Sequence, residues 1–300
     1  MPNKPAYTIS QQIELLKQRG MLFRNEESAQ SVLKNISYYR LKGYWWDLQT
    51  DCKQHSIIAG TYFEDVVEIY KFDRQLRIIL FDAIEMIEIA LRTKMIYHLS
   101  LAHGGLWYLN SSLFDNKETH SKNLHELKSE FDRSQEIFVK DHKRRYPDKD
   151  ADAWKTLEVA SMGMLSKLYK NIHHQSSEKS IIAKEMGLNL HNELSSWLES
   201  IAYLRNMIAH HSRLWNRNMV KKPIFNLKNP SGLWFSEVPV EDQTKKPFLI
   251  ISCMLYLCDQ IEPEHQIRSE ILGLIGNHPS IPVYKLGFFN NWNTQPIWNN

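Results

Sequence analysis

The chain has 300 residues, of which 43% are hydrophobic and 24% are charged. These proportions are typical of a folded globular protein and exclude a disordered one. The 37 basic residues nearly balance the 34 acidic residues, for a formal net charge of +3, which excludes a uniformly basic coat for nucleic acid and leaves only a local basic patch. Glycine and proline number 11 each, too few for a turn-rich all-β protein.

The three cysteines, Cys52, Cys253 and Cys258, are too few and too scattered for a disulfide framework or a zinc finger. The polar N-terminus shows no signal peptide, and no run of about 18 apolar residues predicts a membrane-spanning helix. We therefore expect a cytoplasmic protein without a membrane partner.

Residues 1–55 are expected to form a small helical lobe. Apolar side chains fall at helical spacing over residues 9–19, and residues 26–46 form a second helical unit, so the pair is compatible with a helix-turn-helix. Aromatic and basic residues are interleaved in this second unit, among them Tyr39 and Arg40. Such a mixture can stack bases and pair with phosphates, or it can simply dock the lobe on the rest of the chain.

Residues 56–277 are expected to form the main helical domain, which begins with a long helix. Neither glycine nor proline occurs between Thr61 and Gly104, so the segment is one long helix or two helices with a soft break near Asp73. The middle of this segment is apolar on almost all sides, which predicts a buried helix. Its polar exceptions include Glu88 and Arg92, which share one face and form either an internal salt-bridge network or the wall of a site.

A highly charged segment at residues 118–145 predicts one exposed helix. It ends in a basic run that includes Arg144 and Arg145. This run is either a solvated surface, which is the usual role of a charge run, or a contact for RNA phosphates.

The remaining periodic segments are also helical, so the predicted fold class is all-α. Helices are expected over residues 154–172, with Ser161-Met162-Gly163 as a close-packing or bending point, and over residues 189–211, 248–262 and 264–274. The tail, residues 278–300, is expected to be irregular and to pack on the body. Its aromatic anchors are Tyr284, Phe288, Phe289, Trp292 and Trp298.

The helix predicted over residues 189–211 carries the residues with the clearest chemistry. Its apolar side chains fall on one face, and Arg205 borders that face, where a guanidinium needs a carboxylate or a phosphate. Asn206 and His210 are four residues apart and share one side. Arg205 and His210 lie roughly 140° apart on an ideal helix, so they converge only if the helix ends or kinks, or if a second helix completes the site. His211 is the alternative partner.

A histidine, an arginine and an asparagine together suit the cleavage of RNA. Imidazole exchanges protons near neutral pH, and guanidinium holds a phosphate and stabilises charge that develops on it. The asparagine amide orients the imidazole or donates to an oxygen. The ribose 2′-OH would attack the adjacent phosphorus, so this route needs no metal and would not cut DNA. Arg213 and Arg217 follow the helix and could extend the contact with phosphates.

The motif resembles that of the HEPN superfamily, in which an arginine precedes a histidine by a few residues. Here Arg205-Asn206, three further residues and His210-His211 close a helix, and the surrounding LRNMIAHHSRLWNR looks like the Abi-like (AbiD/AbiF) family of bacterial abortive-infection proteins. The resemblance spans nearly the whole chain. Further segments resemble the family in order: QQIELLKQRGM, NISYYRLKGYWW, IEIALRTKMIYHL, WKTLEVASMGMLSKLY and LGFFNNWNTQPIW. Gly287-Phe288-Phe289 stands where the family has Gly-Phe-Pro, a departure that concerns only the tail.

The resemblance implies a HEPN-type helical bundle, metal-independent endoribonuclease activity without a cofactor, and a role in phage defence or as a toxin. It also implies a homodimer in which two copies of the motif face each other, so that the second copy supplies what one helix cannot. An antitoxin-like partner, either RNA or protein, would inhibit such an enzyme.

Several alternatives stay open. The chain is a nuclease, a non-catalytic RNA-binding module, or a helical scaffold of a defence complex. Arg92 and His98, with five residues between them, either form a second motif that lines the RNA site, or Arg92 forms a structural ion pair with Glu88. A zinc site is not expected, because neighbouring histidines on a helix rarely converge on one metal. The histidines concerned are His173, His174, His191, His210 and His211.

Overall fold

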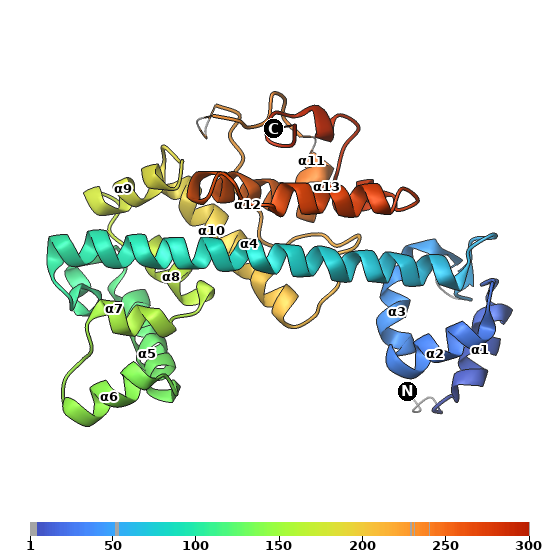
Figure 1. Cartoon of the computed structure of the whole chain (residues 1–300), viewed down its shortest axis with the longest axis horizontal. Helices are drawn as coiled ribbons and strands as arrows, with labels where there is room; N and C mark the ends of the chain where they lie inside the picture. The colour runs from blue at the N-terminus through green and yellow to red at the C-terminus, as the bar shows by residue number, and fades with distance from the viewer. Residues whose placement is uncertain (1–4, 52–53, 229, 231, 240, 300) are drawn as a thin grey trace. The chain divides into compact units, whose positions relative to one another are not determined.

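The computed structural model describes residues 5–51, 54–228, 230, 232–239 and 241–299, so Cys52 lies outside the described residues. It confirms the all-α class (Figure 1). In the described part of the chain, the only sheet is an antiparallel hairpin of β1 (Gln49–Asp51) and β2 (Ser56–Ile57). The α-helices are α1 (Ile9–Gln18), α2 (Glu26–Asn35), α3 (Tyr38–Trp45), α4 (Phe63–His103), α5 (Lys117–Arg133), α6 (Ile137–Arg145), α7 (Ala153–Thr156), α8 (Met162–Asn171), α9 (Ser177–Glu185), α10 (His191–Ala209), α11 (Glu241–Thr244), α12 (Pro247–Ile261) and α13 (Ile267–Asn277).

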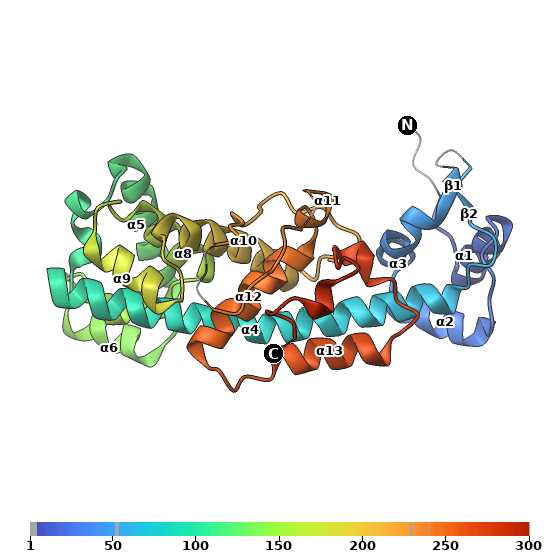
Figure 2. The same ribbon diagram turned by 90° about the horizontal axis from the view of Figure 1, so that it is seen from above.

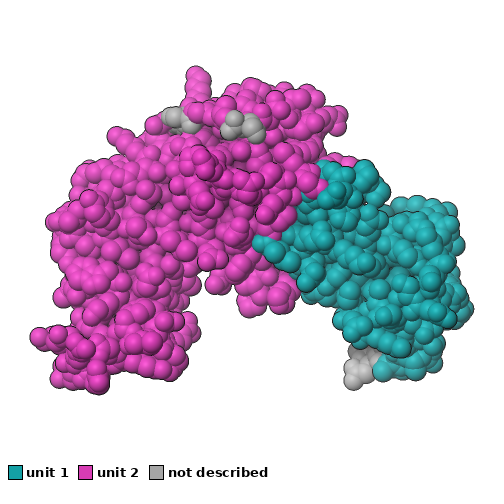
Figure 3. Space-filling model, viewed as in Figure 1, with its two compact units in different colours: residues 1–78, 274–282 teal, residues 79–273, 283–300 magenta. Residues whose placement is uncertain are grey.

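The chain divides into two compact units, which have different colours in Figure 3. Unit 1 comprises residues 1–78 and 274–282, and unit 2 comprises residues 79–273 and 283–300. Helix α4 contributes residues to both units. The domain boundaries that the sequence suggests, near residues 55 and 277, stay predictions.

Unit 1 begins with three short helices whose N-termini are capped by side chains. Thr8 and Gln11 form a reciprocal capping box at the start of α1. Asn25 and Ser37 each accept a hydrogen bond from a backbone amide at the start of α2 and α3. The unit predicted over residues 26–46 is therefore two helices, because the cap at Ser37 starts a new one.

Helix α4 has 41 residues and is about 60 Å long. Leu76 and Leu80 belong to its buried side, whereas Ile78, Phe81 and Ile89 are exposed. The prediction that its apolar middle is buried on almost all sides is therefore wrong, because the other elements of the chain cover only part of the circumference of so long a helix. Despite this length, neither α4 nor any other helix in the described residues is apolar enough to cross a membrane.

Unit 2 is organised around α10, which packs against α8, α9 and α12 (Figure 2). The turn between α9 and α10 depends on Gly187, which has φ +82° and packs closely against the side chains of Tyr256 and Gln260. A Cβ at this position would lie 2.5 Å from Gln260 Cγ, so only glycine fits. The Tyr256 hydroxyl donates to the Gly187 carbonyl at 2.7 Å and ties this turn to α12.

Two segments predicted as single helices are broken in the structure. Residues 118–145 divide into α5 and α6, because Ser134 ends α5 with an extended backbone. Residues 154–172 divide into α7 and α8 at the predicted bending point, because Ala160 is extended and the Ser161 hydroxyl accepts the Met164 amide as the N-cap of α8. Serine side chains compete with the helix for backbone hydrogen bonds, which explains why helical periodicity alone overlooks such breaks.

The aromatic tail is anchored by Trp298, which is buried. Its indole Nε1 donates to Ser252 Oγ at 3.0 Å, and its ring stacks on Phe248 with 5.6 Å between centroids. Tyr284, predicted as another anchor, is exposed, so that part of the prediction is wrong. Tyr284 lies in a short 3₁₀ helix, Val283–Leu286, whose buried residue is Leu286.

Replacing Trp298 by alanine should lower the free energy of unfolding by about 3–5 kcal/mol, because it leaves a cavity and removes the hydrogen bond that the Ser252 hydroxyl accepts from the indole. Urea unfolding measures the change, and Tyr284→Ala, which removes an exposed ring, is the matched control. If the two variants unfold at the same urea concentration, Trp298 does not anchor the tail.

Candidate functional site

The site predicted from the sequence lies at the C-terminal end of α10. The face predicted to be apolar is buried, and its fully buried residues are Leu194, Trp197, Leu198, Ile201 and Leu204. The helix ends at Ala209, and His210 is its C-cap. The convergence of Arg205 and His210 on one substrate stays a prediction.

The end of α10 is a Schellman motif built on the two histidines. The amide of His211 donates to the Ile208 carbonyl at 2.9 Å, and the amide of Ser212 donates to the Met207 carbonyl at 2.8 Å. His211 has φ +55°, in the left-handed region that favours glycine. A non-glycine residue held there stores strain of order 1 kcal/mol, a feature that clusters at functional sites.

The side chains of the motif are accessible to solvent. Arg205 is half-buried, whereas Asn206, His210 and His211 are exposed. Within the described residues, the side chains of Arg205, Asn206 and His210 form no hydrogen bond or ion pair. A guanidinium without a carboxylate at the border of a buried face is available to a phosphate.

The loop after α10 brings further cations to this end of the helix. Arg213 and Arg217 are half-buried, and Trp215, which lies between them in the sequence, is buried. Lys246 Nζ donates to Asn216 Oδ1 at 2.8 Å. The sequence analysis missed Lys246, because no spacing rule connects a residue at the start of α12 to this loop.

Arg92 is buried, and three acceptors satisfy it. Its Nε donates to the Leu157 carbonyl at 3.0 Å, and a terminal nitrogen donates to the Ala160 carbonyl at 3.0 Å and to Glu88 Oε1 at 2.7 Å. These contacts tie α4 to the segment between α7 and α8 and support the structural alternative for Arg92. A role for Arg92 and Glu88 in an RNA site stays a prediction.

His98 lies farther along α4 and contacts a different partner. Its Nε2 lies 2.9 Å from Glu185 Oε1, and Lys94 Nζ lies 2.9 Å from Glu185 Oε2. The hydrogen bond from Lys94 is the main cause that holds the pKa of Glu185 below its ordinary value, and His98 adds to it. Arg92 and His98 therefore contact different acidic residues.

The basic run at the end of α6 is partly neutralised. Arg144 and Arg145 both pair with Asp141, at 2.6 and 3.0 Å, and both are exposed. The hydrogen bond from Arg144 is the main cause that lowers the pKa of Asp141. These pairs favour a solvated surface over a phosphate contact.

The aromatic and basic residues of α3 divide into two groups. Tyr44 and Trp45 are buried and dock the helix within unit 1. Arg40 is half-buried, with its guanidinium 5.8 Å from the centroid of the Tyr70 ring. This part of the cluster follows the docking alternative.

The other group forms an exposed stripe. Tyr39 is 79% exposed and Trp46 is 51% exposed. Lys42 Nζ lies between them, 5.9 Å from the Tyr39 ring centroid and 5.0 Å from the Trp46 ring centroid. We call Tyr39, Lys42 and Trp46 the α3 stripe, and its two rings and one cation are the groups that stack bases and attract phosphates.

A cluster that the sequence analysis missed joins Asp115 to His173 and His174. One potential metal-ligating atom from each residue lies within 4.8 Å of the others. The expectation against a zinc site concerns neighbouring histidines on a helix, and it does not apply to His173 and His174, because α8 ends at Asn171 and both lie beyond it. The histidine pair was visible in the sequence, whereas Asp115, 59 residues from His174, was not connected to it.

Comparisons with known proteins give one match. A family model described as "Abi-like protein" matches residues 31–216, more than half of the chain and including the end of α10. No curated protein and no solved structure matches the chain.

The two arginines should respond differently to replacement by alanine. Arg92→Ala should lower the free energy of unfolding by about 3 kcal/mol, because it leaves Glu88 and two carbonyls without their partner. Arg205→Ala should change it by less than about 0.5 kcal/mol, because no partner is lost. Urea unfolding of both variants measures the difference. An equally large loss for Arg205→Ala would assign Arg205 to the structure and remove it from the site.

Proposed function

The chain belongs to the Abi-like protein family, and from this premise we propose that it is a metal-independent endoribonuclease with its active site at the C-terminal end of α10. Membership of the family supports a role in abortive infection, the defence of bacteria against phage. The observation that carries the enzymatic proposal is the half-buried Arg205, which no acidic side chain in the described residues neutralises, beside two exposed histidines.

Each side chain has a role that its chemistry allows. Arg205 holds the scissile phosphate and stabilises the charge that develops on its oxygens. One histidine, His210 or His211, takes the proton from the ribose 2′-OH, and a second histidine gives a proton to the leaving 5′-oxygen. Asn206, one turn before His210, orients the imidazole or donates to a phosphate oxygen.

The reaction balances without a further reactant. The 2′-oxygen forms a bond to phosphorus as the bond to the 5′-oxygen breaks, and the proton lost by the 2′-OH is matched by the proton gained by the leaving oxygen. The products are a 2′,3′-cyclic phosphate and a 5′-OH. The nucleophile comes from the substrate itself, so the proposed route places no metal in the catalytic step.

A second copy of the chain completes this arrangement. Arg205 and His210 are separated by about 7.5 Å along the helix axis as well as by their angle around it, so one copy of the motif does not surround a phosphate. In a homodimer, two copies of the end of α10 face each other across a two-fold axis, and each supplies groups that the other lacks. An antitoxin-like RNA or protein would then act by covering the paired sites.

Arg205→Ala and His210→Ala should each reduce RNA cleavage by at least about 100-fold, because each removes a group that acts in the transition state. The assay maps the ends of a cleaved single-stranded RNA and compares it with the same strand carrying 2′-O-methyl groups, which should not be cut. EDTA should leave the rate unchanged. Exposed residues elsewhere provide the matched controls, Arg133→Ala and His125→Ala.

Cleavage by Arg205→Ala at the rate of the parent, in a variant that keeps its fold, would refute the assignment of the site. Cleavage of the 2′-O-methyl strand would refute the proposed chemistry.

A non-catalytic RNA-binding module is the second candidate, and the α3 stripe favours it. Exposed tyrosine and tryptophan rings on either side of a lysine offer a platform for unpaired bases. The α3 stripe can bind RNA without catalysing a reaction. If the protein binds RNA but does not cleave it, the α3 stripe is the functional site. A helical scaffold of a defence complex would show neither binding nor cleavage.

Tyr39→Ala and Trp46→Ala should each weaken the binding of single-stranded RNA by about 5- to 150-fold, which corresponds to 1–3 kcal/mol per stacked base. Lys42→Ala should lower the slope of log affinity against log salt by about 0.7. Fluorescence anisotropy in the Arg205→Ala background avoids cleavage during the measurement. Tyr284→Ala, which removes an exposed tyrosine that also lies beside a lysine, should bind as the parent does, and equal binding by all variants would exclude the α3 stripe.

A further inference from the structure

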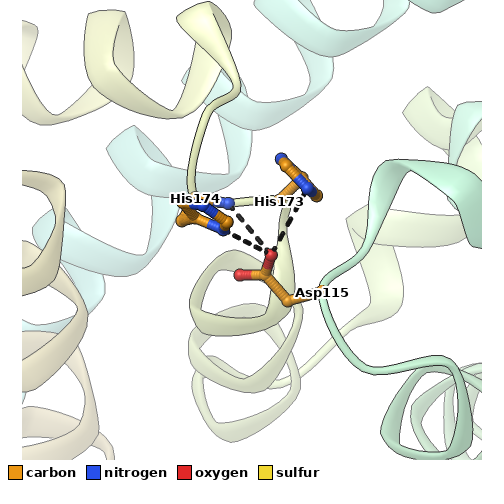
Figure 4. Close-up of side chains that lie close together, drawn as sticks. All are labelled: Asp115, His173 and His174. Carbon is orange, nitrogen blue, oxygen red and sulfur yellow. Dashed lines mark hydrogen bonds and ion pairs between the residues drawn. The ribbon is translucent and has the colours of Figure 1, made fainter.

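Asp115, His173 and His174 converge on one small volume, as Figure 4 shows. Asp115 precedes α5, and both histidines follow α8. Asp115 Oδ1 lies 2.8 Å from His174 Nδ1 and 3.8 Å from His173 Nε2. The two imidazole rings stack with 4.6 Å between their centroids, so both present nitrogen atoms to the same carboxylate.

The backbone that carries these residues is fixed by hydrogen bonds. The Asp115 amide donates to the Asn171 carbonyl at 2.9 Å, and the His173 amide donates to the Leu113 carbonyl at 2.8 Å. Phe114 and Ile172, which are buried, form an isolated antiparallel bridge between these two bonds. The convergence therefore follows from a paired backbone and does not depend on the rotamers of two independent surface side chains.

The side chain of Asn171 adds two hydrogen bonds between the same two segments. Its side-chain oxygen accepts the Asn116 amide at 3.1 Å, and its side-chain nitrogen donates to the Asn116 carbonyl at 2.9 Å. A backbone held at these points on both sides of the cluster is the support that a metal site requires.

The donor set suits a transition metal. Bonds of about 2.0–2.1 Å from zinc to imidazole nitrogen and carboxylate oxygen place tetrahedral ligand atoms about 3.3 Å apart. The observed distances of 2.8 and 3.8 Å from Asp115 Oδ1 to the two imidazole nitrogens lie on either side of this value, and all three potential ligand atoms lie within 4.8 Å of one another. Two nitrogen donors and one oxygen disfavour Mg²⁺ and Ca²⁺, which prefer oxygen ligands.

We propose that Asp115, His173 and His174 bind Zn²⁺, with water at the fourth position. The ion would connect the start of α5 to the segment between α8 and α9, and it would act on the stability of unit 2. The cluster lies near the N-terminal end of α10, where His191 neighbours His174, whereas the proposed nuclease site lies at the other end of this 19-residue helix, which is about 28 Å long. The metal site is therefore separate from the site proposed for RNA cleavage.

Two local features limit the affinity. His173 Nδ1 accepts the Gln175 amide at 3.2 Å, and binding of zinc through Nε2 places a proton on Nδ1 and breaks this hydrogen bond. The buried Lys179 ammonium, which donates to the Lys170 and Ile172 carbonyls, is a positive charge close to Asp115. His173 is thus the weakest of the three ligands, and binding is weaker than in a structural site with four protein ligands.

Titration calorimetry with zinc chloride on the full chain, without a polyhistidine tag and after treatment with EDTA, tests the proposal. The parent should bind one Zn²⁺ per chain, and zinc should raise its melting temperature. Asp115→Asn and His174→Ala should weaken binding at least about tenfold. Loss of a residue that only hydrogen-bonds to a metal ligand already costs this much, so loss of a ligand should cost no less. His173→Ala should weaken it by a smaller factor.

His125→Ala, which removes an exposed histidine from α5, is the matched control and should bind as the parent does. Magnesium chloride should not raise the melting temperature. Because Asp115 also accepts the His174 amide, circular dichroism of Asp115→Asn verifies its fold, and His174→Ala tests the site without removing that acceptor. The proposal is wrong if the parent binds no zinc, or if the Asp115 and His174 variants bind it as tightly as the parent.

Discussion

A guanidinium that leaves bulk water must find acceptors, and this requirement separates the two arginines on which the interpretation depends. Arg92 meets it inside the chain, through one carboxylate and two carbonyl groups. Arg205 borders the buried face of α10, and its guanidinium has no acceptor among the described residues. Both arginines precede a histidine at similar spacing, so spacing alone does not distinguish a structural ion pair from a phosphate-binding group. Their surroundings do.

The sequence predicts what depends on local periodicity. The buried face of α10, its end near His210 and the all-α class follow from apolar residues at intervals of three and four. The break at Ser134 and the exposure of Ile78 do not, because they depend on the local backbone after α5 and on how much of α4 the other elements cover.

The candidate sites show the same limit. Arg205, Asn206 and His210 are close in the chain, so one stretch of sequence contains them. The cluster of Asp115 with His173 and His174 is closed by two segments that are far apart in the sequence and meet through backbone pairing. Only the structure reveals such a pairing, since neither segment has a pattern that points to the other.

The left-handed conformation of His211 has a consequence for how variants of this protein would be selected. Glycine suits this backbone position better than any other residue, so a screen for yield or heat resistance alone would tend to replace the imidazole. An increase in robustness obtained in this way would remove one of the two histidines from the end of α10. Improvement of the fold and preservation of the chemistry therefore conflict at this single position, as in other proteins whose functional residues occupy strained backbone.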